Sequence, residues 1–491
     1  MKMYRNEIFN RDISYSRDKR RLNRSCPPGP SRLSFSNLSP FVSQDMHIKL
    51  NKLADTYGDV YRLKVSEGDI VVLNGLNTVN YALLDQDDVF MHRAEFDIMK
   101  QYPQRHFMEL KSGESWMKHR HIFITAIRNY FSSKSGEIER WYLEEVNELA
   151  QGMRKNQGIA FNPAYLLAYV NLSFMQRMAF GRRCSENDKH GFDVDARGTM
   201  PNNVMNAINF GLLPRFFKLI FFAFRVRNIL GAIKNLSGLT AYIDLNSKER
   251  KRTYSPGRLR DICDHLLKAY FQLDTEERKN LGLNYDDVVN GSLNQFIGSG
   301  VTLSSSASLW MLYYLMKYPD VQKELQSEMD STLSGPPKMS DRSKLPYMQA
   351  FICEVLRHIP IFIIPAVHYR TGKDTVINGF FIGKDTPIII NYHSVTRDPV
   401  AWPDPESFDP KRFIDSSGNF RKEQQNKFFP FGIGARRCIG EHIGRMQIFL
   451  VLAQLLYQFD FSFPEKGDTS EVRPGMLRVL KDCRIVATPR R

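Results

Sequence analysis

The segment of this sequence best suited to chemistry is Phe431–Gly440, FGIGARRCIG, which places Cys438 among glycines and arginines. A cysteine thiolate can serve as an axial ligand of iron when its surroundings exclude water and compensate its negative charge. Gly434 and Gly440 let backbone N–H groups approach such a sulfur, and a helix beginning near residue 439 directs its N-terminal dipole toward it. The segment therefore predicts Cys438 as an iron ligand. A free structural cysteine in a loop is the alternative.

Two other residues of the segment suit the same site. Phe431 is placed to shield one face of a bound cofactor, and Arg436 is placed to pair with a carboxylate of that cofactor. The five fixed positions of the pattern Phe-x-x-Gly-x-Arg-x-Cys-x-Gly occur by chance in a chain of this length with a probability on the order of 10⁻⁴ at average residue frequencies. The pattern is therefore a specific signal.

With this pattern the chain resembles the cytochromes P450, and it is similar to their microsomal-type animal branch, which includes drug- and steroid-oxidising members. The likeness extends over nearly the whole chain from Pro27, in PPGP, onward. It implies a mostly α fold with a small β subdomain and a haem b whose iron is ligated by Cys438. It also implies insertion of one oxygen atom from O₂ into a lipophilic steroid, fatty acid or xenobiotic, with electrons from NADPH through a reductase.

A second motif of the family lies upstream of the cysteine. Glu354 and Arg357 stand in EVLR, which matches the family's ExxR, and their spacing places both side chains on one face of a helix. Arg412, in PKRF, matches the third member of the family's triad. The resemblance implies that this triad braces the Pro-rich meander of residues 402–413 under the haem.

The resemblance also assigns residues to the haem propionates. Trp116 and Arg120, in GESWMKHR, match the family's WxxxR. They lie about one helical turn apart, and both the indole N–H and the guanidinium can donate to a carboxylate. Arg370, in HYRTGKDT, falls where the family often has a further propionate donor.

The central helix departs from the family pattern. Most related monooxygenases carry a small residue, Gly, any residue, an acid and Thr there, and the acid and hydroxyl relay protons. In FIGSGVTLSSS, Thr302 stands at the acid position and Leu303 at the threonine position. One interpretation is that Thr302 or Ser304 holds a water that relays protons. The alternatives are an isomerase or dehydratase that acts on peroxides without a reductase, and a non-catalytic haem-binding protein.

The resemblance implies two partners, an acidic flavin-containing reductase like the NADPH-cytochrome P450 reductase and a lipophilic small molecule. A basic face on the cysteine side of the haem would dock the reductase; its expected residues are Lys118, His119, Arg120, Arg436 and Arg437. Apolar and aromatic residues are expected to contact the substrate; they are Phe96, Ile98, Met99, Tyr102, Phe107, Met205, Ile208, Phe210 and Val301.

Composition limits the other classes of function. The formal net charge is +15, but no basic patch with interleaved aromatics lies outside the N-terminal tail, so no nucleic-acid partner is expected. An acidic protein or an anionic membrane surface fits the charge at least as well, and a well-solvated basic surface is the alternative. The six cysteines show no CxxC spacing, which indicates a reducing compartment.

Membrane signals are confined to one segment. Residues 1–26 form a basic, polar tail without an apolar core, so they are predicted to be neither a signal peptide nor a spanning helix. Residues 211–231 mix aromatics and aliphatics with four basic residues, which suits a segment lying in a membrane interface. A helix packed on the core is the alternative. The resemblance implies the cytoplasmic face of the endoplasmic reticulum membrane.

The elements that must position these residues are predicted as one haem-thiolate domain over residues 27–491. Its β-rich lobe comprises about 55–80 and 360–395, its helical lobe about 113–357, and its haem-binding loop 431–440. Alternating apolar residues predict a hairpin over 60–75 with its turn at Gly68-Asp69. The run from Asp286 to Met316, nearly free of charge, predicts a helix buried through the centre of the fold.

Overall fold

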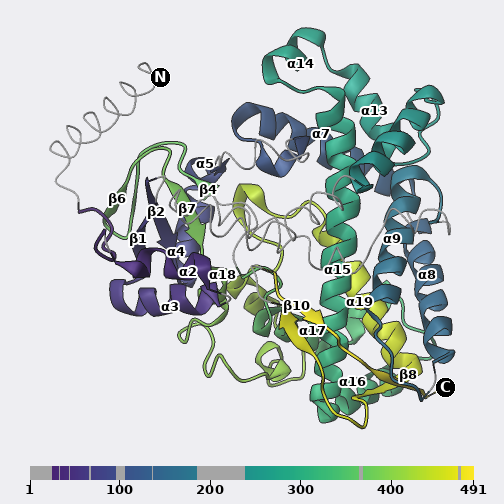
Figure 1. Ribbon diagram of the computed structural model, residues 1–491. Helices are drawn as coiled ribbons and strands as arrows, with labels where there is room; N and C mark the ends of the chain where they lie inside the picture. The colour runs from purple at the N-terminus through teal and green to yellow at the C-terminus, as the bar shows by residue number, and fades with distance from the viewer. Residues whose placement is uncertain are drawn as a thin grey trace.

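The protein is described by a computed structural model in which most residues are helical and one sheet stands to the side (Figure 1). The described residues are 25–32, 34–43, 45–65, 68–94, 106–134, 136–156, 158–184, 238–363, 369–473 and 477–490. This arrangement confirms the predicted mostly α fold with a small β subdomain.

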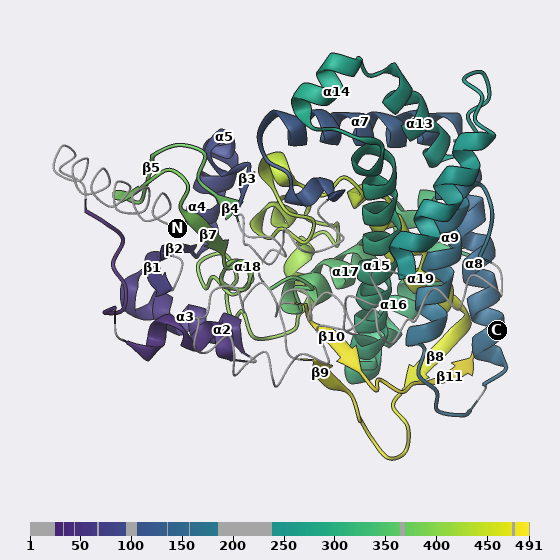
Figure 2. The same ribbon diagram turned by 45° about the horizontal axis from the view of Figure 1, so that its top comes forward.

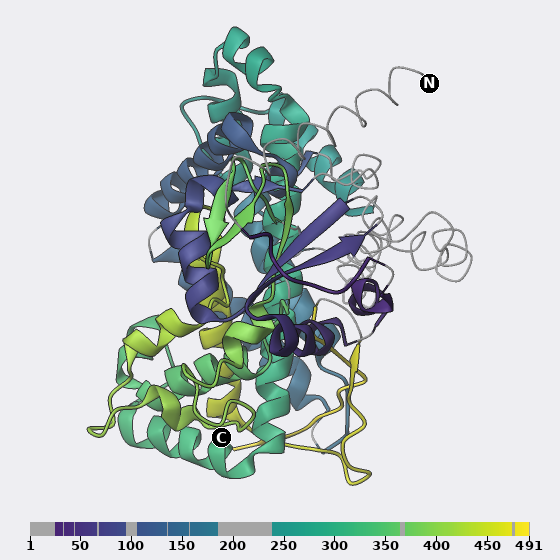
Figure 3. The same ribbon diagram turned by 90° about the vertical axis from the view of Figure 1, so that its left-hand side faces the viewer.

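The sheet of the β subdomain joins segments from both halves of the chain. Its strand order is β1 (Val60–Val65), β2 (Gly68–Leu73), β7 (Pro387–Ile390), β4 (Tyr369–Arg370) and β3 (His92–Arg93). The pairing of β2 with β7 is parallel, whereas the other pairings in this sheet are antiparallel. Figure 3, which faces this side of the molecule, shows the purple β1–β2 hairpin near the green strands.

Two hairpins follow the local sequence closely. The predicted hairpin over residues 60–75 is confirmed, but Val65 pairs with Gly68, so Gly68 and Asp69 belong to β2 rather than to the turn. A second hairpin joins β5 (Thr375–Ile377) to β6 (Phe380–Ile382). Its two turn residues, Asn378 and Gly379, both have positive φ angles, as a tight hairpin turn requires.

The predicted central helix is α15 (Ser292–Lys317), which follows one π-helical turn over Asp286–Gly291. Figure 2 shows it beside α9 (Ala164–Phe180) and α19 (Glu441–Gln458), with α8 (Glu137–Arg154) on the far side of these two helices. Helix α15 carries apolar side chains on most of its circumference because neighbouring elements cover it on most sides. Its buried apolar side chains belong to the largest core of the protein.

The remaining helices and strands complete the frame around the centre. They are α2 (Ser39–Val42), α3 (Met46–Tyr57), α4 (Leu76–Asn80), α5 (Asp87–Phe90), α7 (Gly113–Ser133), α13 (Ile262–Gln272), α14 (Thr275–Leu281), α16 (Pro319–Thr332), α17 (Pro346–His358), α18 (Tyr392–Thr396), β8 (Phe459–Ser462), β9 (Glu471–Arg473), β10 (Val479–Lys481) and β11 (Val486–Pro489). Residues 238–252 are also helical.

Several predicted features fall outside the described residues. They are most of the basic tail (1–24), the segment 211–231, and the expected substrate contacts Phe96, Ile98, Met99, Tyr102, Met205, Ile208 and Phe210. Within the described ranges, no helix combines the length and the apolar character that crossing a bilayer requires.

Candidate functional site

The loop around Cys438 is closed by its own backbone. The Cys438 N–H donates to the carbonyl of Phe431 at 2.8 Å, and the Arg437 N–H donates to the carbonyl of Gly434 at 3.1 Å. Gly432 and Gly434 have φ angles of 70° and 68°, in the left-handed region that favours glycine. Helix α19 begins at Glu441, so its N-terminus lies just after the cysteine, as predicted.

The two glycines expected to serve the sulfur differ in what they contact. The Gly440 N–H donates a hydrogen bond to the Cys438 sulfur, in line with the prediction. Gly434 is instead pressed against another segment, because a Cβ atom there would lie 2.0 Å from the Leu83 carbonyl oxygen. Its lack of a side chain therefore lets the loop lie directly against residues 81–85.

A cavity of about 340 Å³ lies between this loop and the central helix. Phe431, Cys438 and Gly440 form part of one wall, and Leu303 of α15 forms part of another. Burial raises the pKa of the Cys438 thiol, and the Gly440 N–H, Arg120 and Arg437 oppose this shift. The sulfur is thus screened from bulk water by surrounding protein while its side chain remains open to the cavity.

One edge of the cavity is rich in hydrogen-bond donors. The guanidinium of Arg436 lies 3.7 Å from the centre of the Trp116 ring and donates to the carbonyls of Met91 and Lys111 at 2.7 and 2.6 Å. Its Nη1 is buried and has no hydrogen-bond partner within the described part of the chain. Burial, aided by the charge of Arg93, lowers the pKa of Arg436 to about 8. This edge favours an anionic ligand because it holds more donors than acceptors.

Arg120 and Arg93 extend this donor-rich edge. Both line the cavity with Trp116 and Arg436, and Arg120 Nη2 donates to the Arg437 carbonyl at 2.5 Å. Burial lowers the pKa of Arg120. The structure therefore brings Trp116, Arg120 and Arg436 together as predicted and adds Arg93, which the sequence motifs did not indicate.

Arg370 does not belong to this edge. It forms an ion pair with Asp385 at 3.2 Å, and the cavity wall is formed by its neighbour Tyr369. Successive side chains of a strand point to opposite faces, so Tyr369 and Arg370 cannot both face the cavity. In the paired strand Arg93 stands opposite Tyr369, and this register places Arg93 where Arg370 was expected.

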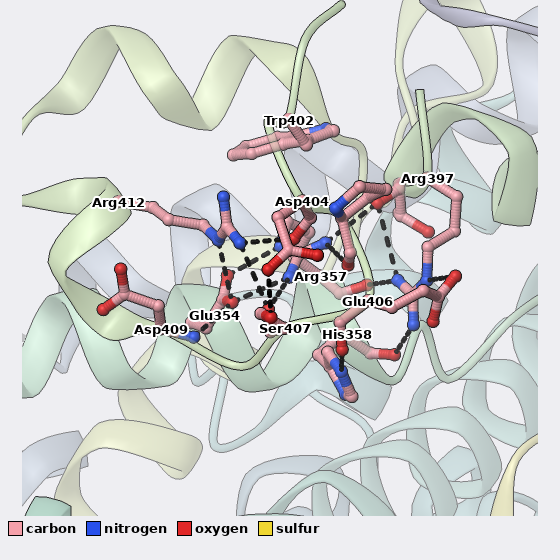
Figure 4. Close-up of polar contacts among 12 residues, drawn as sticks. Glu354, Arg357, His358, Arg397, Trp402, Asp404, Glu406, Ser407, Asp409 and Arg412 are labelled. Carbon is pink, nitrogen blue, oxygen red and sulfur yellow. Dashed lines mark hydrogen bonds and ion pairs between the residues drawn. The ribbon is translucent and has the colours of Figure 1, made fainter. Parts of the chain in front are cut away.

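The predicted Glu354–Arg357–Arg412 cluster is present, with Glu354 and Arg357 buried and Arg412 half-buried (Figure 4). Arg357 donates to Glu354 through Nε and Nη2 at 2.6 and 2.7 Å, and both residues are 0% exposed. Arg412 Nε lies 3.4 Å from Glu354 Oε1, and the same oxygen accepts the Asp409 N–H at 2.9 Å. Burial raises the pKa of Glu354, whereas Arg357 and Arg412 lower it. The pair is therefore enclosed by protein and not a surface ion pair.

The cluster also holds the meander by its backbone. Arg357 donates to the carbonyls of Thr396, Pro405 and Ser407 at 3.0, 2.8 and 3.1 Å. Trp402 covers the Arg357 guanidinium at 5.4 Å, as Figure 4 shows from the side. A loop without regular structure is fixed in this way because buried carbonyl groups require donors.

The expected basic face is smaller than predicted. His119 is fully buried, bonds to the Ser292 hydroxyl at 2.9 Å, and has a pKa lowered to about 4 by burial, so it is neutral near pH 7. Lys118 pairs with Glu277, and Arg436 lines the cavity. Arg437 exposes 60% of its side chain. Consecutive residues of a helix face different directions, so Lys118, His119 and Arg120 of α7 do not form one exposed face.

The expected substrate contacts Phe107 and Val301 are buried but do not line the cavity. On α15, the residues that face it are Gln295, Phe296, Ser299, Gly300, Leu303, Ser304 and Ala307, and Val301 falls on another side of the helix. Further apolar walls come from other elements; these residues include Met108, Phe123, Ile127, Met175, Leu356, Ile361, Phe362 and Val395.

Of the two candidate proton-relay residues, the described structure places Ser304 but not Thr302 on the cavity wall. Ser304 Oγ donates to Gln447 Oε1 at 2.8 Å, and Gln447 Nε2 donates to Asn171 Oδ1 at 2.7 Å. Gln447 also lines the cavity and was not predicted. The sequence signal that could have indicated Gln447 is its polar side chain within the apolar run of helix α19.

Comparison with known proteins identifies the family. The sequence matches the family model described as Cytochrome P450 over residues 27–484. The chain belongs to the cytochrome P450 family. A "Polybrominated aromatic compounds synthase" of Pseudoalteromonas luteoviolacea is 38% identical over 427 residues, which is 87% of each chain. Cytochrome P450 1A1 of Mesocricetus auratus and of Rattus norvegicus are 30% and 31% identical, covering 93% of this chain and 88% of theirs.

As a cytochrome P450, the protein is an oxidoreductase of the monooxygenase class that depends on a haem iron, a lipophilic substrate and a redox partner. The observed fold is accordingly the cytochrome P450 fold. The residues present fit the haem, because a cysteine sulfur opens into the cavity and, among the described residues, the buried Nη1 of Arg436 has no acceptor at the cavity edge.

Proposed function

We propose that this cytochrome P450 is a haem b monooxygenase that inserts one oxygen atom from O₂ into a lipophilic aromatic substrate, with electrons from NADPH through a reductase. The observation that carries the proposal is the open Cys438 sulfur facing α15 across the cavity. When bound, the haem iron supplies oxygen activation, which thiolate ligation favours. The protein supplies binding, orientation and electrostatics.

Residues of the chain take distinct roles in this proposal. Cys438 would ligate the iron, and the Gly440 N–H would compensate the charge of its sulfur. The side chains of Trp116, Arg93, Arg120 and Arg436 would hold the propionates by donating hydrogen bonds. Phe431 would shield the cofactor on the side of the cysteine, and Gly434 allows its loop to lie against Leu83. The cluster of Glu354, Arg357 and Arg412 holds the meander beneath.

Ser304 is the residue proposed to move or hold a proton at its Oγ. It faces the cavity at the helix step after Leu303, and Gln447 accepts its hydrogen bond, which fixes the hydroxyl orientation. Thr302, the other candidate of the sequence pattern, is not on the wall and takes no part. A positioned hydroxyl that contacts water can transfer protons without an acidic side chain.

The substrate class is proposed from the walls and from one relative. Aromatic and aliphatic side chains dominate the cavity, with Phe123, Phe296 and Phe362 among them. The Pseudoalteromonas relative is named for polybrominated aromatic compounds. Aromatic rings pack favourably against aromatic walls, so an apolar aromatic ligand fits this cavity better than a polar one.

The partner is proposed to be an acidic flavoprotein reductase that docks beside the cysteine loop, where Arg437 exposes its guanidinium. The net charge of +15 supports both this docking and attachment to an anionic membrane surface. We place the protein at the cytoplasmic face of the endoplasmic reticulum membrane. Cell fractionation with a detergent-release step tests this placement.

A reduced, carbon-monoxide-bound spectrum and an NADPH-consumption screen test the proposed function. A thiolate-type Soret band together with substrate-dependent NADPH oxidation in the presence of reductase is the expected result. Turnover of a hydroperoxide without reductase or NADPH would instead identify an isomerase or dehydratase. The thiolate band without NADPH oxidation by any ligand would identify a non-catalytic haem-binding protein.

A further inference from the structure

An acidic side chain lines the cavity beside its donor-rich edge. Glu109, in the short helix Met108–Leu110, lines the same space as Cys438. Its Oε2 accepts a hydrogen bond from Gln295 Nε2 of α15 at 3.1 Å. Burial raises the pKa of Glu109, and Arg93, Gln295 and Arg436 oppose this shift. A carboxyl group is costly in such a place unless a ligand or a neighbour uses it.

The pair formed by Glu109 and Gln295 lacks donors. Gln295 Oε1 is buried and has no hydrogen-bond partner within the described ranges. The Gln295 bond is the one hydrogen bond that the Glu109 carboxyl makes to the described residues. Two acceptor groups therefore face the same region with a single donor between them. Because buried acceptors are normally satisfied, a ligand that donates a hydrogen bond would complete the pair.

We propose that Glu109 and Gln295 bind a hydroxyl group on an aromatic substrate and so fix which part of its ring faces the Cys438 side of the cavity. This inference deepens the proposed function and rests on it. The walls around the pair accept the ring, and the pair accepts the hydroxyl hydrogen. A hydroxyl is the smallest neutral substituent of a ring that donates a hydrogen bond.

The surrounding charges select a neutral donor over a cationic one. Arg93 and Arg436 line the same cavity and act electrostatically on Glu109. These guanidinium groups oppose the entry of an ammonium group. An anionic substrate group is opposed by the carboxyl itself and by the unpartnered oxygen of Gln295. A phenol is therefore the class of substrate that fits.

Calorimetric titration of the ferric, haem-loaded protein tests this inference by binding rather than by turnover. The probes are 4-ethylphenol, its methyl ether 4-ethylanisole, and 4-ethylbenzylamine, which share ring and tail. The wild-type protein is expected to bind the phenol about tenfold more tightly than the ether, because one buried hydrogen bond is gained. The Glu109→Met variant removes both carboxyl oxygens, which leaves Gln295 Oε1 as the one acceptor of the pair, and it is expected to remove most of this preference. Glu109→Gln keeps one acceptor and should retain part of it.

The control variant is Glu114→Met, because Glu114 lies in the same stretch but is exposed and outside the cavity. It should keep the wild-type preference. Equal affinities for phenol and ether, tighter binding of the amine, or a preference that is undiminished in Glu109→Met would overturn the inference. The reduced carbon-monoxide spectrum of each variant is recorded separately. Loss of the thiolate band would count against the proposed function, whereas a normal band with no phenol preference counts against this inference alone.

Discussion

The carbonyl oxygen of Leu83 occupies the space into which a side chain at Gly434 would project. A Cβ atom at Gly434 would lie 2.0 Å from that oxygen, well inside contact distance. Because Gly434 has no side chain, the loop of residues 431–440 can lie directly against the π-helical turn Tyr81–Asp85. The position of Cys438 relative to the cavity depends on this contact, because its loop closes on Gly434.

The first prediction follows from this contact. Gly434→Ala is expected to shift the loop and to reduce haem retention severalfold, since backbone cannot yield as a flexible side chain does. Gly418→Ala is the matched control, because Gly418 also has a positive φ of 83° but has open space around it. The control carries only the backbone strain, about 1 kcal/mol. Haem content per protein is the measurement, and equal haem content in both variants would contradict the steric argument.

Replacement of the ligand itself is the second prediction. Cys438→Ala should abolish the thiolate-type Soret band while the protein remains folded, because the loop is held by backbone hydrogen bonds that do not involve the sulfur. Cys353→Ala serves as control, since that thiol is buried on α17 away from the cavity wall. Circular dichroism and the reduced carbon-monoxide spectrum are measured together. A thiolate band that persists in Cys438→Ala would refute the assigned ligand.

The third prediction concerns the buried Glu354–Arg357 pair. Arg357→Lys loses the bidentate geometry and leaves the Pro405 carbonyl without its donor. An unpaired buried carbonyl should lower the free energy of unfolding by about 1–3 kcal/mol, as measured by denaturant titration. The exposed pair of Arg421 and Glu423 provides the comparison, and Arg421→Lys should have little effect. Similar losses in the two variants would contradict the structural role.

Ser304 is tested by the coupling of electrons to product. Ser304→Ala removes the hydroxyl that donates to Gln447 and should raise the fraction of NADPH consumed without product severalfold. Thr302→Val should leave this ratio near the wild-type value, since Thr302 is not on the cavity wall. Product formed per NADPH is the quantity to measure. The reverse pattern would assign the relay to Thr302.

The last prediction concerns acid stability. His47 and His393 lie with ring centroids 4.5 Å apart, and burial lowers their pKa values to about 4 and about 2. The ordinary value is about 6.5, so the unfolded chain binds protons first as the pH falls below that value. The stabilising effect of the neutral rings is complete above pH 6.5 and diminishes as the pH falls toward the folded-state pKa values. At pH 5 each of the two histidines should therefore lower the free energy of unfolding by about 2 kcal/mol relative to pH 7.5.

Urea unfolding at pH 7.5 and pH 5 measures this loss. His47→Phe replaces one of the two buried rings by an apolar ring that does not titrate, so its stability should fall less between the two pH values. His442→Phe is a suitable control, because the His442 side chain is exposed and its ring contacts Phe131 at 6.1 Å rather than either histidine of this pair. An identical pH dependence in the wild type and His47→Phe would contradict the assignment.

Much of the frame and several site residues could be predicted from short stretches of sequence. The loop of residues 431–440, the hairpins and the nearly charge-free helix α15 are governed by turn chemistry and by periodicity, which neighbouring residues set. Glu354 and Arg357 stand three residues apart, so the helix itself brings them together. Arg412 and the Trp116–Arg120 pair needed the family motif in addition.

The tertiary structure alone decided which side chains share the cavity. Arg93 replaces Arg370 because strand register turns Tyr369 inward, and His119 is buried because its face of α7 meets Ser292. Glu109 and Gln295 meet across 186 positions of the chain. Local sequence specifies backbone conformation through short-range sterics and hydrogen bonding. The direction of a side chain and the neighbours that set its charge state depend on packing between segments that are distant in sequence.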